Sequence, residues 1–175
     1  MRKYLYLLVL IFITGVVSGL SFRYITQNGN ILGAIIIAII IFSLQRIIEN
    51  QYLKPINNQK KIVEEIAVDL IKYANFYGNT IFCDIMKEEY KIASSRIREL
   101  SALLQVKTSN INFYSFFYII KLIKMEKEDA LKAGTILMAL SNSFFDSETS
   151  TQNTKNAEQA TEIRKLLNIS EFKIY

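Results

Sequence analysis

The stretch "YKIASSRIRELSALL", residues 90–104, carries the clearest structural signal in this chain of 175 residues. Apolar or small side chains return along it at steps of three and four residues, at Tyr90, Ala93, Ile97, Leu100 and Leu104. This spacing places them on one face of an α-helix. The pattern therefore predicts a helix over about residues 84–106 with one buried face.

Two arginines flank this apolar face. With about 100° of rotation per residue, Arg96 and Arg98 leave the helix about 100° to either side of Ile97, so their guanidinium groups do not converge on one substrate. Glu99 lies three residues after Arg96, which predicts an ion pair on the helix surface. Arg98 has no carboxylate at its neighbouring helical positions. It is open to a distant carboxylate, to solvent or, like Arg96, to a contact with a partner or an anion.

The composition argues against the common catalytic and metal sites. The chain has no histidine and one cysteine, Cys83, which excludes Cys/His zinc sites, Ser-His-Asp triads and an internal disulfide. Small helical domains of the HEPN class carry an Arg-x(4–6)-His motif, and Ser101 stands where Arg96 would need its histidine. We therefore predict no enzyme, no cofactor and no metal; a HEPN-like domain here would be a non-catalytic version.

Further helical patterns surround the central stretch. Residues 56–77 show the same spacing and end at Gly78. Residues 113–123, "FYSFFYIIKLI", suit a strand or a helix, and the neighbouring helical patterns favour a helix. Residues 126–145 begin with acidic side chains, which suit a helix N-terminus. Their inward positions are mostly small, which predicts a close crossing with another helix: Ala130, Ala133, Gly134, Leu137, Ser141 and Phe144.

The C-terminal part divides into a polar segment and a short helix. Residues 146–156, "DSETSTQNTKN", contain no apolar side chain and are typical of a flexible loop. Residues 157–169 predict a helix, and we expect the final "EFKIY" to dock as an extended tail. Residues 56–175 are long enough to bury a core of their own. The sequence thus predicts an all-α fold in which four to five helices form a cytosolic bundle.

Two apolar runs stand before this domain. Residues 4–22 are long enough to cross the hydrocarbon core of a bilayer, which needs about 20 helical residues. Residues 31–48 are nearly as long if Arg46 reaches the interface, and an Asn-Gly-Asn turn signal separates the two runs. The sequence predicts a transmembrane helical hairpin over residues 1–48. Small residues that allow close helix packing in lipid are Gly15, Gly19 and Gly33.

Basic residues near the ends of these runs predict the topology. The loop between the runs carries Arg23 alone, whereas the outer flanks carry Arg2, Lys3, Arg46, Lys54, Lys60 and Lys61. We therefore expect both termini to be cytoplasmic, in a multi-pass protein of the bacterial inner membrane. A secretory signal cleaved near Ser18 is the alternative, which the second apolar run directly after it disfavours.

The net charge of +5 invites a nucleic-acid partner. Arg2, Lys3 and Arg23 supply three of these charges, and residues 45–175 hold 18 Lys and Arg against 16 Asp and Glu. The part of the chain after the apolar runs is therefore nearly balanced. We predict no nucleic-acid partner, and we assign the many aromatic side chains to core packing.

Several segments resemble a family of small bacterial proteins with N-terminal membrane anchors and a helical cytosolic domain. They are "YANFYGN" (73–79), "YKIASSRIRELSALL" (90–104), "INFYSFF" (111–117), "ALKAGTILMALSNSFFD" (130–146) and "NAEQATEIRKLLNI" (156–169). The family patterns are "LR-LAS-L", "LSNSLF" and "I-LL-I", and this chain departs from the first with Ser101-Ala102 in place of Ala-Ser. The resemblance covers about residues 56–169. It implies bacterial origin, membrane anchoring and a helical fold, and it implies no activity.

These observations favour a non-enzymatic inner-membrane protein. We expect its partners to be the lipid bilayer and either another protein or further copies of this chain, bound through the helical domain. The alternative is an oligomeric stress or phage-defence effector that perturbs the membrane and carries a degenerate HEPN-like domain. A nuclease ranks third, because the histidine of that motif is missing.

Overall fold

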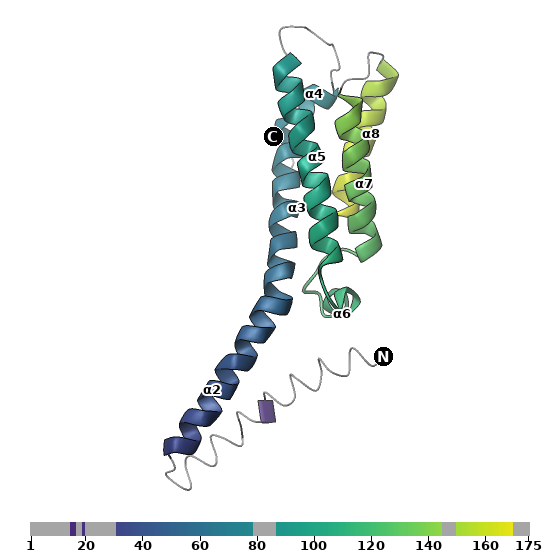
Figure 1. Cartoon of the computed structure of the whole chain (residues 1–175). Helices are drawn as coiled ribbons and strands as arrows, with labels where there is room; N and C mark the ends of the chain where they lie inside the picture. The colour runs from purple at the N-terminus through teal and green to yellow at the C-terminus, as the bar shows by residue number, and fades with distance from the viewer. Residues whose placement is uncertain (1–14, 17–18, 20–30, 79–86, 145–149, 170–175) are drawn as a thin grey trace, which may run out of the picture. The chain divides into compact units, whose positions relative to one another are not determined.

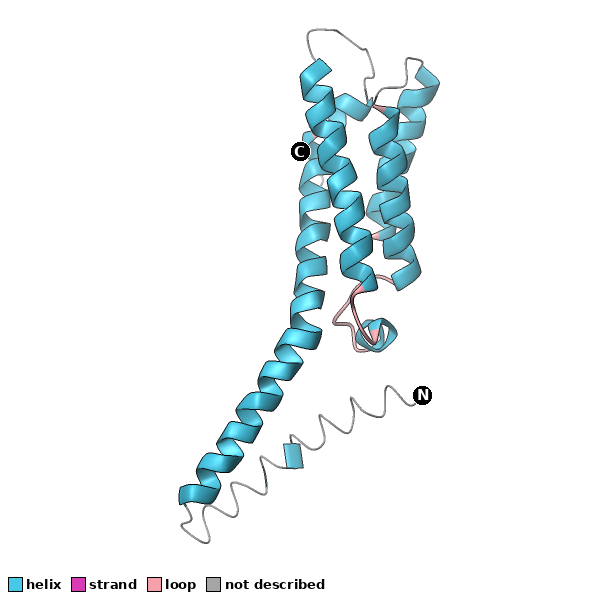
Figure 2. Ribbon diagram, viewed as in Figure 1, coloured by secondary structure: helices cyan, strands magenta, loops and turns pink. Residues whose placement is uncertain are grey.

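The structure, a computed structural model, describes residues 15–16, 19, 31–78, 87–144 and 150–169. Throughout these residues the regular elements are helical, with no strand (Figure 2), which confirms the predicted all-α class. The chain divides into two compact units, Met1–Pro55 and Ile56–Tyr175, which we describe separately.

The first unit contains α2 (Ile31–Ile48) followed by η1, a π-helical turn (Glu49–Leu53). One helix among the described residues, Ile35–Lys72, is long and apolar enough to cross a membrane, and none of its apolar window is buried. Its large exposed side chains in α2 include Ile35, Ile36, Ile39, Ile40 and Phe42. This exposure costs free energy in water and none in lipid, so α2 is a candidate membrane span.

The predicted hairpin is not shown by the structure. Of the first apolar run, Gly15, Val16 and Gly19 are described and are helical, and the connecting segment 20–30 lies outside the described residues. Within the described part of the chain, no atom lies within 4 Å of a Cβ placed on Gly15 or Gly19. The packing of Gly15, Gly19 and Gly33 against a neighbouring membrane helix therefore stays a prediction.

The backbone remains helical across Lys54-Pro55, where a proline disfavours an uninterrupted α-helix. The backbone N–H of Lys54 donates to the carbonyl of Glu49, five residues earlier, and α3 (Lys54–Lys72) begins at this point. Pro55 thus lies in the first turn of α3, a position that tolerates its missing N–H. A single π-helical turn absorbs the irregularity.

The second unit is a bundle of helices (Figure 1). After α3 come α4 (Ala74–Gly78), α5 (Lys87–Ser109), α6 (Tyr114–Ile119), α7 (Lys127–Ser143) and α8 (Ser150–Leu166). In Figure 1, α5 runs between α3 and α7, and α8 lies behind α7. Among the described residues the four longer helices run side by side, and α4 and α6 are short.

The predicted apolar faces form the core of this bundle. The described members of the α5 face, from Tyr90 to Leu104, are buried, and so is the small-residue face of α7 from Ala130 to Phe144. Residues 84–86, the predicted start of the first helix, lie outside the described residues. The spacing of the apolar residues was sufficient to predict the buried faces of α5 and α7, because each helix buries one continuous apolar stripe.

The segment 113–123 forms the short helix α6 and then a turn. Phe113 precedes the helix with φ 59°, and Lys121 follows it with φ 59°, both in the left-handed region. The backbone N–H groups of Leu122 and Ile123 donate to the carbonyl of Phe117, which closes the turn. The prediction of a helix rather than a strand is confirmed, although the helix is short.

The prediction of a flexible loop over residues 146–156 is wrong for its second half, because α8 begins at Ser150. The inward position of this first part is occupied by a polar side chain, Asn156, which is fully buried. Its Nδ2 donates to the carbonyl of Tyr77 at 3.0 Å, and its Oδ1 accepts from Gln152 at 2.9 Å. The helix therefore shows no apolar stripe there. Residues 145–149, and the tail 170–175 that we expected to dock, lie outside the described residues.

Candidate functional site

The crossing between α5 and α7 is held by two serines one heptad apart. Ser94 Oγ donates to the carbonyl of Ser141, and Ser101 Oγ donates to the carbonyl of Gly134, each at 2.7 Å. A hydroxyl on a short side chain reaches a backbone carbonyl of another helix when the two backbones approach closely. The predicted close crossing is confirmed.

Gly134 shows how little space this crossing leaves. A Cβ placed on Gly134 would lie 2.7 Å from Cγ of Gln105 on α5. The neighbouring α5 residue Ser101 is fully buried and faces the same turn of α7. Ser94 and Ser101 therefore connect α5 to α7 and are buried, whereas Ser95 of the same stretch is exposed.

Arg96 binds three carboxylates at the other edge of α5. Its Nε donates to Asp69 at 2.9 Å, one Nη donates to Glu65 at 2.6 Å, and the other donates to Glu99 at 2.9 Å. The hydrogen bonds that Arg96 donates to Glu99 and then to Asp69 are the main reasons that the pKa of Arg96 is raised above its usual value. The predicted pair with Glu99 is confirmed, and the two partners on α3 could not be found from helical spacing. This cluster gives Arg96 a structural role between α3 and α5.

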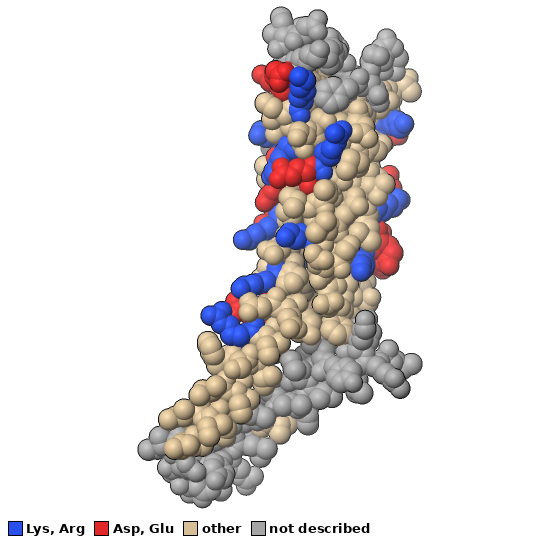
Figure 3. Space-filling model, in the orientation of Figure 1, with Lys and Arg blue, Asp and Glu red and all other residues tan. Residues whose placement is uncertain are grey.

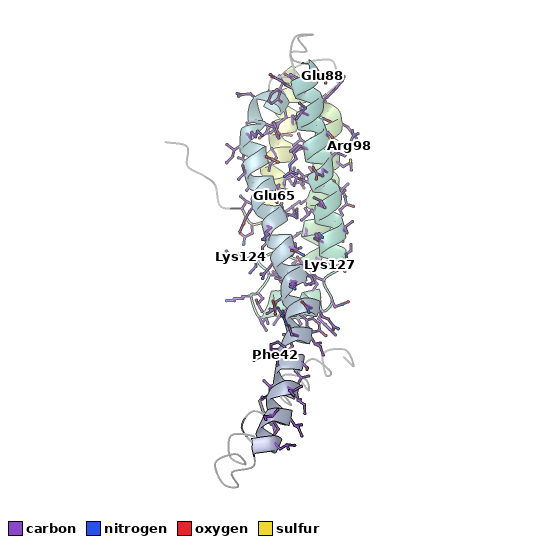
Figure 4. The ribbon with its side chains drawn as sticks, turned by 60° about the vertical axis from the view of Figure 1, so that its left-hand side comes forward. Phe42, Glu65, Glu88, Arg98, Lys124 and Lys127 are labelled. Carbon is purple, nitrogen blue, oxygen red and sulfur yellow. The ribbon has the colours of Figure 1, made fainter. Side chains whose placement is uncertain are left out.

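Arg98 leaves α5 toward α7 instead. Its Nη2 donates to Oδ1 of Asn142 at 2.8 Å, and the side chain is exposed. Figure 4 labels Glu65 on α3 and Arg98 on the edge of α5 away from α3. The wheel prediction of divergent arginines is confirmed. The partner of Arg98 is an amide, which leaves its positive charge uncompensated by this contact.

A buried polar cluster joins α3, α5 and α6. Gln59 is 1% exposed, and its Nε2 donates to Oγ1 of Thr108 at 2.8 Å and to the hydroxyl oxygen of Tyr114 at 3.0 Å. Burial raises the pKa of Tyr114 to about 12, although the hydrogen bond from Gln59 acts in the opposite direction. Sequence reasoning missed this cluster, because a lone glutamine between Asn57-Asn58 and Lys60-Lys61 carries no sign of burial.

The raised pKa of Tyr114 predicts a loss of stability at alkaline pH. Since the folded pKa of about 12 exceeds the unfolded value of 10.0, the contribution is full below pH 10 and is lost as pH rises toward 12. Relative to Tyr114→Phe, the wild-type chain is expected to lose about 3 kcal/mol more unfolding free energy over this range. Urea titrations of both proteins at a series of pH values measure the difference; parallel pH profiles would contradict the assignment.

An open groove of about 480 Å³ with a mostly apolar lining lies along α3 in the second unit. Two lysines, Lys60 and Lys124, and one carboxylate, Glu64, line it together with a largely apolar floor. The floor is formed by Val63, Ala67, Val68, Ile123, Met125, Leu167 and Ile169. Val68 is 63% exposed and lines this groove.

The charged side chains do not form a second kind of site. In Figure 3, the described basic and acidic residues of the helical domain are interspersed on the side in view, with no continuous basic face. Among the described residues, no group of three or more His, Cys, Asp and Glu side chains is arranged to hold a metal ion. The three carboxylates around Arg96 accept hydrogen bonds from its guanidinium, which occupies the centre of the cluster.

The described residues define a class: an all-helical domain that follows a candidate membrane helix. Comparisons with protein-family models, curated proteins and solved structures found no match for this chain. What the chain does must therefore be argued from its own surface, where the apolar groove is the leading candidate site.

Proposed function

We propose that this chain is a non-enzymatic, membrane-anchored protein whose helical domain binds a protein partner at the membrane surface. The observation that carries the proposal is α2, in which Ile35, Ile36, Ile39, Ile40 and Phe42 are exposed while the second unit buries its own apolar faces. A helix of this composition is stable in lipid and costs free energy in water. The domain of residues 56–175 would then be held next to the bilayer.

The proposed topology is that of a bacterial inner-membrane hairpin with both termini cytoplasmic. Basic residues outside the two apolar runs outnumber the single Arg23 between them, which supports this orientation. The GxxxG spacing of Gly15 and Gly19, with Gly33 in the second run, supports packing of the two helices against each other.

The groove along α3 is the proposed contact surface, and its proposed occupant is an amphipathic segment of a partner protein. An apolar floor of this size accepts a few large aliphatic side chains from one face of a helix or strand. Lys60 and Lys124 outnumber Glu64 at its rim, which favours an occupant with carboxylates beside its apolar face. A protein partner binds such a surface mainly through a few buried apolar side chains, and the charges at the rim set the orientation of the partner.

The test compares Val68→Asp with Ile92→Asp, two substitutions at exposed aliphatic side chains, of which Val68 alone lines the groove. Both proteins are extracted from alkaline-washed membranes of the native host and analysed by native mass spectrometry. We expect the wild type and Ile92→Asp to carry a protein partner. Val68→Asp should weaken the complex about thirtyfold, because its carboxylate would lie against the aliphatic side chains of the partner and would repel the partner's carboxylates.

Each other outcome counts against the proposal. Loss of the chain from alkaline-washed membranes would refute the anchoring. A complex that contains only two copies of this chain would show self-association and would overturn the proposal of a different partner protein. A monomer in every preparation, or equal effects of the two substitutions, would remove the groove as the contact surface.

A further inference from the structure

The end of α6 exposes three consecutive large side chains. Tyr118, Ile119 and Ile120 are 39%, 74% and 45% exposed, and Ile119 is the most exposed large hydrophobic residue among those described. Lys121 then takes a left-handed conformation that ends the helix. We name Tyr118–Lys124 the α6 tip. Exposed apolar residues in a contiguous patch mark an interaction site rather than an ordinary surface.

The α6 tip lies at the end of the helical domain where the chain enters it. Gln59, in the first turns of α3, bonds to Thr108 near the end of α5 and to Tyr114 in α6, so these three elements meet at one end of the bundle. The domain begins at Ile56, eight residues after α2 ends at Ile48. The tip is thus on the end of the domain that is nearest in sequence to the candidate membrane helix.

Charge on this part of the chain is positive. Between Leu100 and Met125 there is no Asp or Glu, and the segment holds Lys107, Lys121 and Lys124. Two carboxylates act on the tip: the charge of Glu126, and to a smaller extent that of Asp129, raises the pKa of Tyr118. In Figure 4, the labelled Lys124 and Lys127 lie in the half of the helical domain that contains α6. Exposed aliphatic side chains insert into the headgroup region of a bilayer, and neighbouring lysines are attracted to anionic lipids, so this combination suits an anionic lipid surface.

We propose that the α6 tip docks onto an anionic lipid surface, with Ile119 and Ile120 entering the headgroup region and Lys121 and Lys124 binding lipid phosphates. This inference rests on the proposed membrane anchoring, which brings the tip within reach of a bilayer. The tip is a short run of adjacent apolar residues at a helix end, which suits shallow insertion. The groove along α3 is concave and suits a protein segment; it borders the tip, because Ile123 and Lys124 also line it.

The test uses tryptophan as a depth probe, because the chain contains none. The full chain is reconstituted in phosphatidylcholine vesicles with phosphatidylglycerol, with a brominated lipid as quencher. Ile119→Trp reports on the tip, Phe42→Trp reports on α2, and Ile92→Trp is the matched exposed control on α5. We expect quenching of the first two and little quenching of Ile92→Trp.

The three probes separate the two proposals. Quenching at Phe42→Trp with Ile119→Trp no more quenched than Ile92→Trp would overturn the lipid contact and leave the anchoring intact. No quenching at Phe42→Trp would overturn the anchoring and the tip contact together. Equal quenching of all three would show a domain that collapses nonspecifically onto lipid, which also contradicts a defined tip.

The contribution of the lysines is measured in the Ile119→Trp protein. Adding Lys121→Gln and Lys124→Gln is expected to lower the ratio of docked to free tip about 25-fold, since each lysine near an anionic surface contributes about a fivefold factor. Lys155→Gln, an exposed lysine on α8, is the control and should leave quenching unchanged. Unchanged quenching in the double variant, or equal quenching in vesicles of phosphatidylcholine alone, would overturn the role of anionic headgroups.

Discussion

Ser101→Leu is expected to lower the unfolding free energy by about 3 kcal/mol. Ser101 is fully buried at the point where α5 crosses α7, and its hydroxyl donates to the carbonyl of Gly134. A branched side chain would push into the backbone of α7, since Gly134 leaves no room even for a Cβ beside Gln105. It would also remove the hydrogen bond. Urea unfolding of the full chain in detergent, followed by far-UV circular dichroism, measures the loss.

Two controls separate overpacking from loss of the hydrogen bond. Ser101→Ala removes the hydroxyl without adding volume and should cost about 1 kcal/mol. Ala102→Leu adds the same volume at the next residue, which is exposed, and should change stability by less than about 0.5 kcal/mol. A Ser101→Leu protein as stable as Ala102→Leu would show that the two helices can separate at no cost, which the close crossing excludes.

Arg96→Gln is expected to destabilise the domain by about 2 kcal/mol. The substitution leaves Asp69, which is 8% exposed, buried beside Glu65 and Glu99 without its cation. Glu65 and Glu99 are about half exposed, so water screens their share and most of the cost arises at Asp69. The same urea titration measures it.

A double-mutant cycle identifies the cause. If the cost comes from an unpaired Asp69, then Asp69→Asn added to Arg96→Gln should recover most of the lost stability. Arg98→Gln is the matched control, because Arg98 is exposed and bonds to an amide of α7, and it should cost less than about 0.5 kcal/mol. If the losses of unfolding free energy in Arg96→Gln and Asp69→Asn simply add in the double variant, the stabilising role of Arg96 does not come from its ion pair with Asp69.

Arg96 and Arg98 show which contacts helical periodicity can predict and which it cannot. Their divergence on α5 follows from the rotation per residue, and so does the pair of Arg96 with Glu99. Asp69 and Glu65 lie 27 and 31 residues away in the chain, and nothing in the local sequence connects them to Arg96. Long-range ion pairs depend on how helices are placed side by side, which periodicity does not specify.

Buried polar residues account for the main errors. Gln59 and Asn156 occupy inward positions of α3 and α8, where a pattern of apolar residues would be expected. Each is satisfied by a distant group, Thr108 and Tyr114 for Gln59 and the carbonyl of Tyr77 for Asn156. A polar side chain is tolerated in a core when its hydrogen bonds are made there, and this depends on the partner rather than on the residue. For this reason the first turns of α8 looked like a loop.

The sequence alone predicts the all-helical class and the inward faces of α5 and α7. It also predicts the close crossing of small residues and the apolar character of residues 31–48. Each of these features depends on residues a few positions apart along one helix. The packing of the helices decides which carboxylates of α3 surround Arg96 and which amide accepts the hydrogen bond of Arg98. It also decides the buried Gln59 cluster, the groove along α3 and the exposed α6 tip. These features join residues that are remote in the chain, and their energies come from burial and hydrogen-bond partners that exist only in the folded bundle.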